Sequence, residues 1–264
     1  MTESGGFWAN RKRRNALVTA TCAIVLLAAV AALFIAFRPG ADDDRRMLPP
    51  ATSTALPQGV SLVAKVNGPQ VGVYETPGAP APIKTLENPW LLNGAIDRPV
   101  PQVLLVEEQR QDGWVHVLLA ERPNGSTGWI RQSDVNIIQN PYHVEVNLGA
   151  HEIKVLQGTA EIYKGEVAIG APSTPTPTGK SYIRVLLETP DPTSVYGPYA
   201  YGLSGHSDVL TEFNGGDGEI GLHGNNDASV LGKSVTAGCI RIDNEEISKL
   251  AKMLPLGTPV EITS

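Results

Sequence analysis

The chain has 264 residues, of which 42% are hydrophobic and 18% are charged, and its formal net charge is −6 at pH 7. This length has room for two modest domains and a membrane segment, and the composition is that of a globular protein rather than a disordered or fibrous one. After the first 47 residues the chain carries 14 basic and 23 acidic side chains, a formal charge of −9, so we expect no nucleic-acid partner.

An uncharged apolar run from Asn15 to Phe37 follows four basic residues at positions 11–14. At about 1.5 Å per residue, the run is long enough to cross a hydrocarbon core of roughly 30 Å. The basic residues favour a cytoplasmic tail over 1–14, so the sequence predicts a single-pass membrane protein, exported after Arg38 to the periplasm or cell wall. A cleaved signal peptide is the alternative, although its apolar region is normally about 7 to 15 residues long.

The exported part begins with a linker over 38–57, rich in Pro, Ala, Asp, Thr and Ser. Residues 58–140 then contain short β-favouring stretches separated by Pro and Gly turns, which predicts a small β barrel or sandwich. The stretches are Val60–Val66, Gln70–Tyr74, Val103–Glu107, Trp114–Ala120 and Gly128–Ile130.

Two tryptophans of this region, Trp114 and Trp129, allow two interpretations. Together with Tyr74 and Trp90 they would suit the wall of a ligand groove. Their alternating strand positions favour packing in the core instead, and this is our prediction. His116 carries no partner motif and is expected to be structural.

Residues 141–264 also have a mainly β pattern, with turns at Gly and Pro. The predicted strands are His143–Leu148, Glu152–Leu156, Ala160–Ala168, Ser181–Leu187 and Pro259–Thr263. One helix is expected after Asp243 or Asn244, either of which suits an N-cap.

A stretch rich in Gly, Pro, Ser and Tyr, positions 189–218, predicts a long loop over a site. Its tyrosines, at positions 196, 199 and 201, suit either substrate walls or packing within the loop.

The segment Gly221–Ile242, G-L-H-G-N-N-D-A-S-V-L-G-K-S-V-T-A-G-C-I-R-I, places a histidine and a cysteine with 15 residues between them. A free thiol has a pKa of roughly 8.5 and needs a base to become a nucleophile near neutral pH. The turn residues between His223 and Cys239 allow the chain to fold back, which would bring imidazole and sulfur within hydrogen-bond reach. A buried, inert cysteine is the alternative. Because Cys22 lies in the apolar run, Cys239 has no disulfide partner in the exported part, and catalysis would explain an unpaired thiol there.

This segment resembles the catalytic signature of the bacterial L,D-transpeptidases with a YkuD-type domain, a His-Gly pair followed by (S/T)-x-G-C-(I/V)-R. Further similar stretches are V-A-I-G-A-P-S-T-P-T-P-T-G-K (167–180), Y-G-P-Y-A (196–200) and L-P-L-G-T-P-V-E-I (254–262). Several matches in the right order extend the resemblance over 141–264. The stretch D-G-W-V-H-V-L-L-A-E-R-P-N-G-S-T-G-W-I-R (112–131) resembles bacterial SH3-like domains.

The resemblance implies that Cys239 is the acylated nucleophile, that His223 is its general base, and that the carbonyl of Gly224 orients the imidazole. The amides of Gly238 and Cys239 would form the oxyanion hole. Many members carry a second histidine where this chain has Ala237. The residues expected to bind substrate are Arg241, Asn225, Tyr199, Ser204 and His206.

The resemblance further implies an enzyme that acts on peptidoglycan stem peptides, with no cofactor. The thiol would attack the third residue of a donor tetrapeptide and release D-Ala, and an acceptor amine would resolve the thioester into a 3-3 cross-link. The family is typically acylated by carbapenems. An L,D-carboxypeptidase, and a wall-binding protein with a retired site, remain alternatives.

Metal and nucleotide sites are not expected from the sequence. The five histidines show no metal-ligand spacing. Gly216, Gly218 and Gly221 fit G-x-G-x-x-G, but no helix follows them and no βαβ pattern surrounds them.

Overall fold

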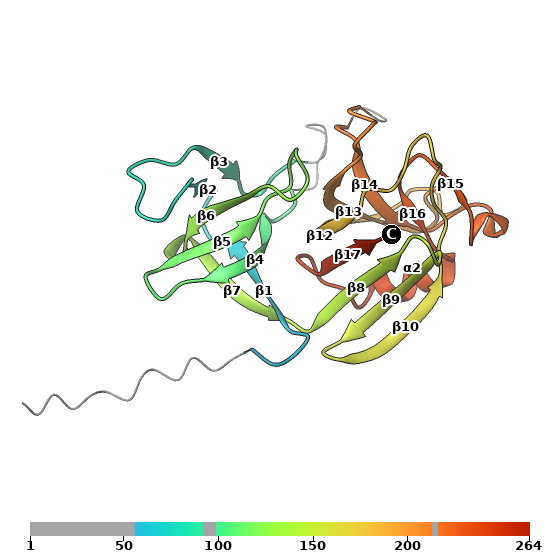
Figure 1. The fold of residues 1–264 in the computed structure, drawn as a ribbon, viewed down its shortest axis with the longest axis horizontal. Coiled ribbons are helices and arrows are strands. Elements are labelled where there is room, and N and C mark those ends of the chain that lie inside the picture. The colour runs from blue at the N-terminus through green and yellow to red at the C-terminus, as the bar shows by residue number, and fades with distance from the viewer. Residues whose placement is uncertain (1–55, 92–98, 213–215) are drawn as a thin grey trace, which may run out of the picture. The chain divides into compact units, whose positions relative to one another are not determined.

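The computed structural model describes residues 56–91, 99–212 and 216–264 (Figure 1). The predicted cytoplasmic tail, transmembrane helix and most of the linker lie outside the described residues. Among the described residues, no helix has the length and apolar character needed to cross a membrane. The part Ala55–Ser264 clusters as one compact unit.

The first half of this unit is a five-stranded antiparallel sheet in the order β6-β5-β4-β1-β7 (Figure 1). A two-stranded ladder, β2 with β3, accompanies it. The bounds are β1 Ser61–Val66, β2 Gln70–Val73, β3 Lys84–Glu87, β4 Val103–Gln109, β5 Trp114–Leu118, β6 Thr127–Arg131, the short 3-10 helix η2 Gln132–Asp134 and β7 Val135–Asn140. The β-rich prediction for this region is therefore confirmed, while an SH3-like identity stays a prediction.

The two tryptophans of β5 and β6 do not lie in the core. Val115 and Ile130 are buried and face each other across the two strands, whereas Trp114 and Trp129 occupy the alternate positions and are only half-buried. The guanidinium of Arg131 lies 5.9 Å from the Trp114 ring centroid. The core prediction for these tryptophans is wrong because successive strand residues face opposite sides, and the β-branched residues take the inner side.

The second half is an eight-stranded sheet in the order β10-β9-β8-β17-β12-β13-β14-β16 (Figure 1). Its strands are β8 Tyr142–Asn147, β9 Glu152–Gln157, β10 Ala160–Glu166, β12 Gly179–Glu188, β13 Tyr199–His206, β14 Glu219–His223, β16 Ile240–Arg241 and β17 Pro259–Thr263. The smaller elements are β11 Ile169–Gly170, the 3-10 helix η3 Ala228–Val230, β15 Ser234–Thr236 and the helix α2 Asn244–Ala251.

The expectation of one long loop over 189–218 is wrong for Tyr199–His206, which forms the strand β13 between β12 and β14. Tyr201 and Leu203 are fully buried at alternate positions. Gly202, Ser204 and Gly205 obscured this period of two, because glycine and serine are weak strand formers.

The helix α2 confirms the predicted helix and its cap. The Asp243 side chain accepts hydrogen bonds from the backbone N–H groups of Glu245 and Glu246. The helix follows the strand β16 in the chain. Its residues Ile247 and Leu250 are buried in the hydrophobic core of the second sheet.

The two halves share buried contacts. The side-chain amide of Asn140 donates to Thr258 Oγ1 at 3.0 Å in a buried position. Tyr182, on β12 of the second sheet, packs within the hydrophobic core of the first half. The N-terminal half is thus packed onto the C-terminal half through apolar and polar contacts.

Candidate active site

The residues of the Cys-His segment meet on two neighbouring strands. β14 and β16 run parallel, with Leu222 opposite Ile240 and His223 opposite Arg241. Cys239 directly precedes β16 and lies beside Gly221. A Cβ atom added at Gly221 would lie 3.3 Å from His223 Cδ2 and 3.5 Å from Cys239 Sγ. The imidazole and the sulfur therefore lie on either side of the space that the missing side chain of Gly221 leaves.

The imidazole of His223 is held in one tautomer. Its Nδ1 lies 2.7 Å from the carbonyl oxygen of Gly224, which can only accept a hydrogen bond, so Nδ1 carries the proton. The pKa of His223 is lowered to about 4, mainly because the ring is buried. The hydrogen bond to Gly224 raises this pKa, and the positive charge of Arg241 lowers it. At neutral pH the ring is therefore uncharged, and Nε2 is the basic nitrogen.

Gly224 is required at its position by close packing. A Cβ there would overlap the side-chain oxygen of Asn244 and would come within 3.0 Å of the Gly197 Cα. The same Asn244 oxygen accepts a hydrogen bond from the backbone N–H of Asn225 at 2.8 Å. The first residue of α2 thus fixes the backbone that orients His223.

The sulfur of Cys239 is half-buried and accepts a hydrogen bond from the Gly221 N–H at 3.4 Å. Burial raises the pKa of the thiol, while the Gly221 hydrogen bond and the charge of Arg241 lower it in part. The resting site thus holds a neutral thiol beside a neutral imidazole. Proton transfer to Nε2 is required when the sulfur attacks.

Alkylation of Cys239 by iodoacetamide is expected to accelerate with rising pH through a midpoint above that of an ordinary cysteine, because only the thiolate reacts and burial raises the pKa of this thiol. Rates measured by peptide mapping and mass spectrometry would separate Cys239 from Cys22. A rate that is already maximal at about pH 6 would mean a resting thiolate–imidazolium pair, which contradicts this account.

Two threonines hold the backbone around the sulfur. Thr236 Oγ1 donates to the Cys239 carbonyl at 2.6 Å and accepts from the Gly238 N–H at 3.2 Å. Thr176 Oγ1 donates to the Gly238 carbonyl at 2.8 Å. Gly238 has a φ of +118°, which a residue with a side chain rarely adopts. The Gly238 amide must leave Thr236 before it can serve an oxyanion.

These supporting roles were not predicted from the sequence. Thr236 lies in the T-A-G-C stretch and Gly221 lies two residues before His223. Their places in the motif are the sequence features that could have indicated these roles. Thr176 lies 62 residues from its partner Gly238 and offered no local signal.

A pocket of about 650 Å³ contains both His223 and Cys239 in its wall. Its other lining residues come from β12, β13, β14, the 189–198 segment and the end of the β13–β14 connection. The Tyr196 ring centroid lies 5.0 Å from that of His223. Among the described lining residues there is no Lys or Arg, but four carboxylates are present, those of Glu188, Asp191, Asp217 and Glu219.

None of the five expected substrate-binding residues is among the described lining residues of this pocket. Arg241 follows Cys239 closely enough for its charge to act on the thiol and the imidazole, and it does not itself line the pocket. Asn225 is buried and its side chain donates to the Ile242 carbonyl at 2.7 Å. Tyr199 accepts a hydrogen bond from the Gly224 N–H through its carbonyl at 3.3 Å.

The remaining two, Ser204 and His206, are buried on β13. Ser204 Oγ accepts from the Tyr182 N–H at 3.0 Å, and His206 Nε2 lies 3.1 Å from Asp217 Oδ2. Neither side chain lines the pocket, so a direct role for them in substrate binding stays a prediction.

Comparison of the sequence with known proteins identifies a family. Residues 141–262 match the model of the YkuD family, described as the L,D-transpeptidase catalytic domain. The chain is 32% identical over 122 residues to the putative L,D-transpeptidase YkuD of Bacillus subtilis, which is 46% of this chain and 66% of that protein. It is 33% identical over 127 residues to the putative L,D-transpeptidase YqjB of the same species, 47% of this chain and 72% of that protein. The chain belongs to the L,D-transpeptidase family with a YkuD-type catalytic domain.

Among solved structures, an L,D-transpeptidase from Mycobacterium smegmatis is similar with a TM-score of 0.40 and 13% identity, covering 61% of this chain and 82% of that one. Others include an L,D-transpeptidase in complex with imipenem and a carbamoyl enzyme formed with avibactam. The chain spans somewhat less than two thirds of the YkuD relative, and the matched part lies in the second sheet and α2.

Proposed function

We propose that the protein is a peptidoglycan L,D-transpeptidase in which Cys239 is the nucleophile and His223 the general base. The observation that carries this proposal is the placement of His223 at the end of β14 and of Cys239 directly before the parallel strand β16, on either side of Gly221 and in the wall of one pocket. The hydrogen bond from His223 Nδ1 to the Gly224 carbonyl leaves Nε2 free of its proton, as a base requires.

Acylation follows from this arrangement. Nε2 of His223 takes the thiol proton as Sγ of Cys239 attacks the carbonyl carbon of the third residue of a donor tetrapeptide. The C–N bond to the terminal D-Ala breaks, the imidazolium returns the proton to the departing amine, and a thioester remains. Because the resting groups are neutral, charge develops only during attack, where the amides of Gly238 and Cys239 would stabilise the oxyanion.

The acceptor is proposed to be an amine of a neighbouring stem peptide. Its nitrogen attacks the thioester, His223 takes the excess proton, and the Cys239 thiol is restored. The carboxylates of Glu188, Asp191 and Asp217 in the pocket wall favour the approach of a cationic substrate group. This charge pattern supports an amine acceptor in place of water.

Membrane anchoring through residues 15–37, with the site on the extracytoplasmic side, is part of the proposal and depends on the sequence alone. No metal or diffusible cofactor takes part in the steps above. An L,D-carboxypeptidase would share the acylation step and differ only in the acceptor.

The function is tested by incubating the purified full chain with a donor tetrapeptide stem and analysing products by mass spectrometry. The proposal expects a cross-linked dimer together with free D-Ala. Formation of tripeptide alone would instead identify a carboxypeptidase. A carbapenem adduct on Cys239 is also expected, and its absence together with retained binding to isolated wall would favour a retired wall-binding protein.

A further inference from the structure

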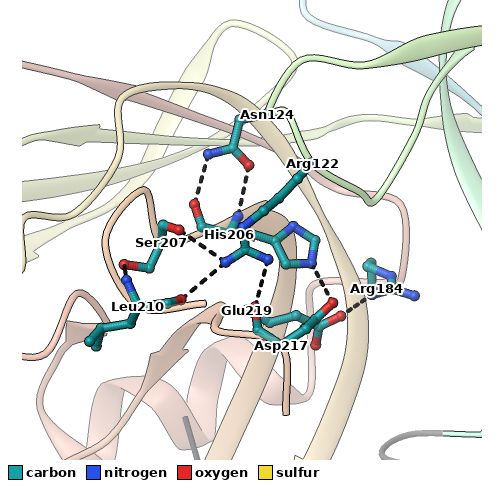
Figure 2. A network of polar contacts seen from close by, with 8 residues as sticks. All are labelled: Arg122, Asn124, Arg184, His206, Ser207, Leu210, Asp217 and Glu219. Atoms are coloured by element: carbon teal, nitrogen blue, oxygen red, sulfur yellow. Dashed lines mark hydrogen bonds and ion pairs between the residues drawn. The ribbon is translucent and has the colours of Figure 1, made fainter. Parts of the chain in front are cut away.

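A polar network outside the Cys-His pair joins the first sheet to the pocket wall, and Figure 2 shows it from close by. Its centre is the guanidinium of Arg122, in the β5–β6 connection. Nη1 donates to the Asp217 carbonyl at 2.6 Å, and Nη2 donates to the carbonyls of Ser207 and Leu210 at 3.0 and 3.1 Å. One side chain thus binds both ends of the connection between β13 and β14.

A second residue of the same turn, Asn124, pairs with the last residue of β13. Its Nδ2 donates to the His206 carbonyl at 2.7 Å and its Oδ1 accepts from the His206 N–H at 2.8 Å. A neighbouring β-strand would make the same pair of hydrogen bonds, one to the backbone carbonyl and one from the backbone N–H. The Asn124 side chain therefore fixes the backbone of β13 where the strand ends.

The backbone of the connection is shaped to receive Arg122. The Ser207 N–H donates to the Gly218 carbonyl at 2.8 Å, which closes the two ends on each other. Gly218 has a φ of +79°, and a Cβ there would overlap the Leu210 carbonyl and lie 3.0 Å from Arg122 Nη2. Only glycine allows the guanidinium this close to the backbone.

The segment held in this way belongs to the pocket. Asp217, Gly218 and Glu219 line the same pocket as Cys239, and Glu219 is the first residue of β14, which ends at His223. The Glu219 carboxylate forms an ion pair with Arg184, whose guanidinium lies 4.2 Å from the Trp90 ring centroid. A residue of the N-terminal half thus also contacts the partner of Glu219.

The same network could suggest a metal site, because ligand atoms of His206, Asp217 and Glu219 lie within 4.8 Å of one another. These atoms already have partners, since His206 contacts Asp217 and Glu219 pairs with Arg184. The two arginines supply the positive charge that an ion would bring. We therefore interpret the cluster as a support for the pocket wall.

We propose that Arg122 and Asn124 are positioning residues of the acyl-transfer site, through which the N-terminal sheet sets the shape of the Asp217–Glu219 wall and so the binding of the stem peptide. This proposal rests on the proposed function and deepens it. Neither side chain contacts Cys239 or His223 in the described contacts. Their effect is therefore on substrate binding and not on the reactivity of the thiol.

The test compares the full chain with Arg122→Ala, Asn124→Ala and the control Arg110→Ala. Arg110 lies on the same half of the molecule and pairs with exposed Asp112. We expect Arg122→Ala to lower kcat/KM for the donor peptide about 10- to 100-fold, mainly through KM. Alkylation of Cys239 by iodoacetamide is expected to stay within about 2-fold of wild type, because the thiol and its base are untouched. Arg110→Ala is expected to match wild type in both measurements.

Arg122→Lys separates charge from geometry. Lysine keeps the positive charge but loses the planar fork, so it is expected to restore only a small part of the lost binding. If Arg122→Ala does not fold, the same KM measurements on Arg122→Lys and Asn124→Ala test the proposal. A wild-type KM in Arg122→Lys and Asn124→Ala would overturn the proposal.

A measurement that does not depend on enzyme activity tests the positioning role separately from the proposed function. Hydrogen–deuterium exchange of the amides from His206 to Leu210 is expected to be faster in Asn124→Ala and Arg122→Ala than in Arg110→Ala. Unchanged exchange there would overturn the positioning role whatever the activity. A wild-type chain that forms no adduct with donor peptide, yet shows the expected exchange, would defeat the proposed function alone.

Discussion

Cys239→Ala is expected to abolish release of D-Ala and formation of cross-linked product, with a loss of roughly 10⁶-fold in kcat, because no other described residue of the pocket wall carries the sulfur that a thioester needs. The fold is expected to remain intact. Among the described residues, the sulfur has one hydrogen bond, the weak one accepted from the Gly221 N–H, and the neighbouring backbone is held by Thr176 and Thr236.

The measurement is product analysis by mass spectrometry, together with a thermal melt followed by circular dichroism. Cys22→Ala is the matched control, since it removes the other thiol of the chain and is expected to leave the activity unchanged. Appreciable turnover by Cys239→Ala would show that a different group is the nucleophile.

His223→Ala is expected to slow acylation about 10³-fold at pH 7, the range typical of a lost general base. The defect is expected to shrink towards pH 10, because the thiol then ionises without help. In the wild-type chain the rate is expected to fall as pH decreases through about 4, where His223 takes up a proton at Nε2. Rates of carbapenem acylation between about pH 3 and pH 10 would give both profiles.

His116→Ala is the matched control for this variant, because His116 stacks on Trp129 in the first sheet and lies outside the pocket. A loss in His223→Ala that is equal at every pH would argue that the imidazole only supports the pocket shape. A general base predicts the pH-dependent loss instead.

Local patterns predicted most of the strands and the helix. The strands β8, β9, β12 and β17 follow from alternating or β-branched residues, and Asp243 marks the start of α2. The strand β13 was not predicted, because its two glycines and Ser204 carry little strand preference and only burial by neighbouring strands determines its state.

The site could be predicted in part. Cys239, His223 and Gly224 lie within one short stretch, so a motif is enough to indicate them. Contacts that join distant positions could not be found this way. Arg122 lies 95 residues from Asp217, and its partners are backbone carbonyls that carry no side-chain signal.

Intact-protein mass spectrometry of the full chain with donor tetrapeptide, followed by peptide mapping, tests the central claim most directly. The account predicts a mass increase equal to the donor minus D-Ala, located on Cys239 and lost on addition of an acceptor amine as cross-linked product appears. Product formation with an adduct on any other residue, or with none on Cys239 under rapid quenching, would contradict it.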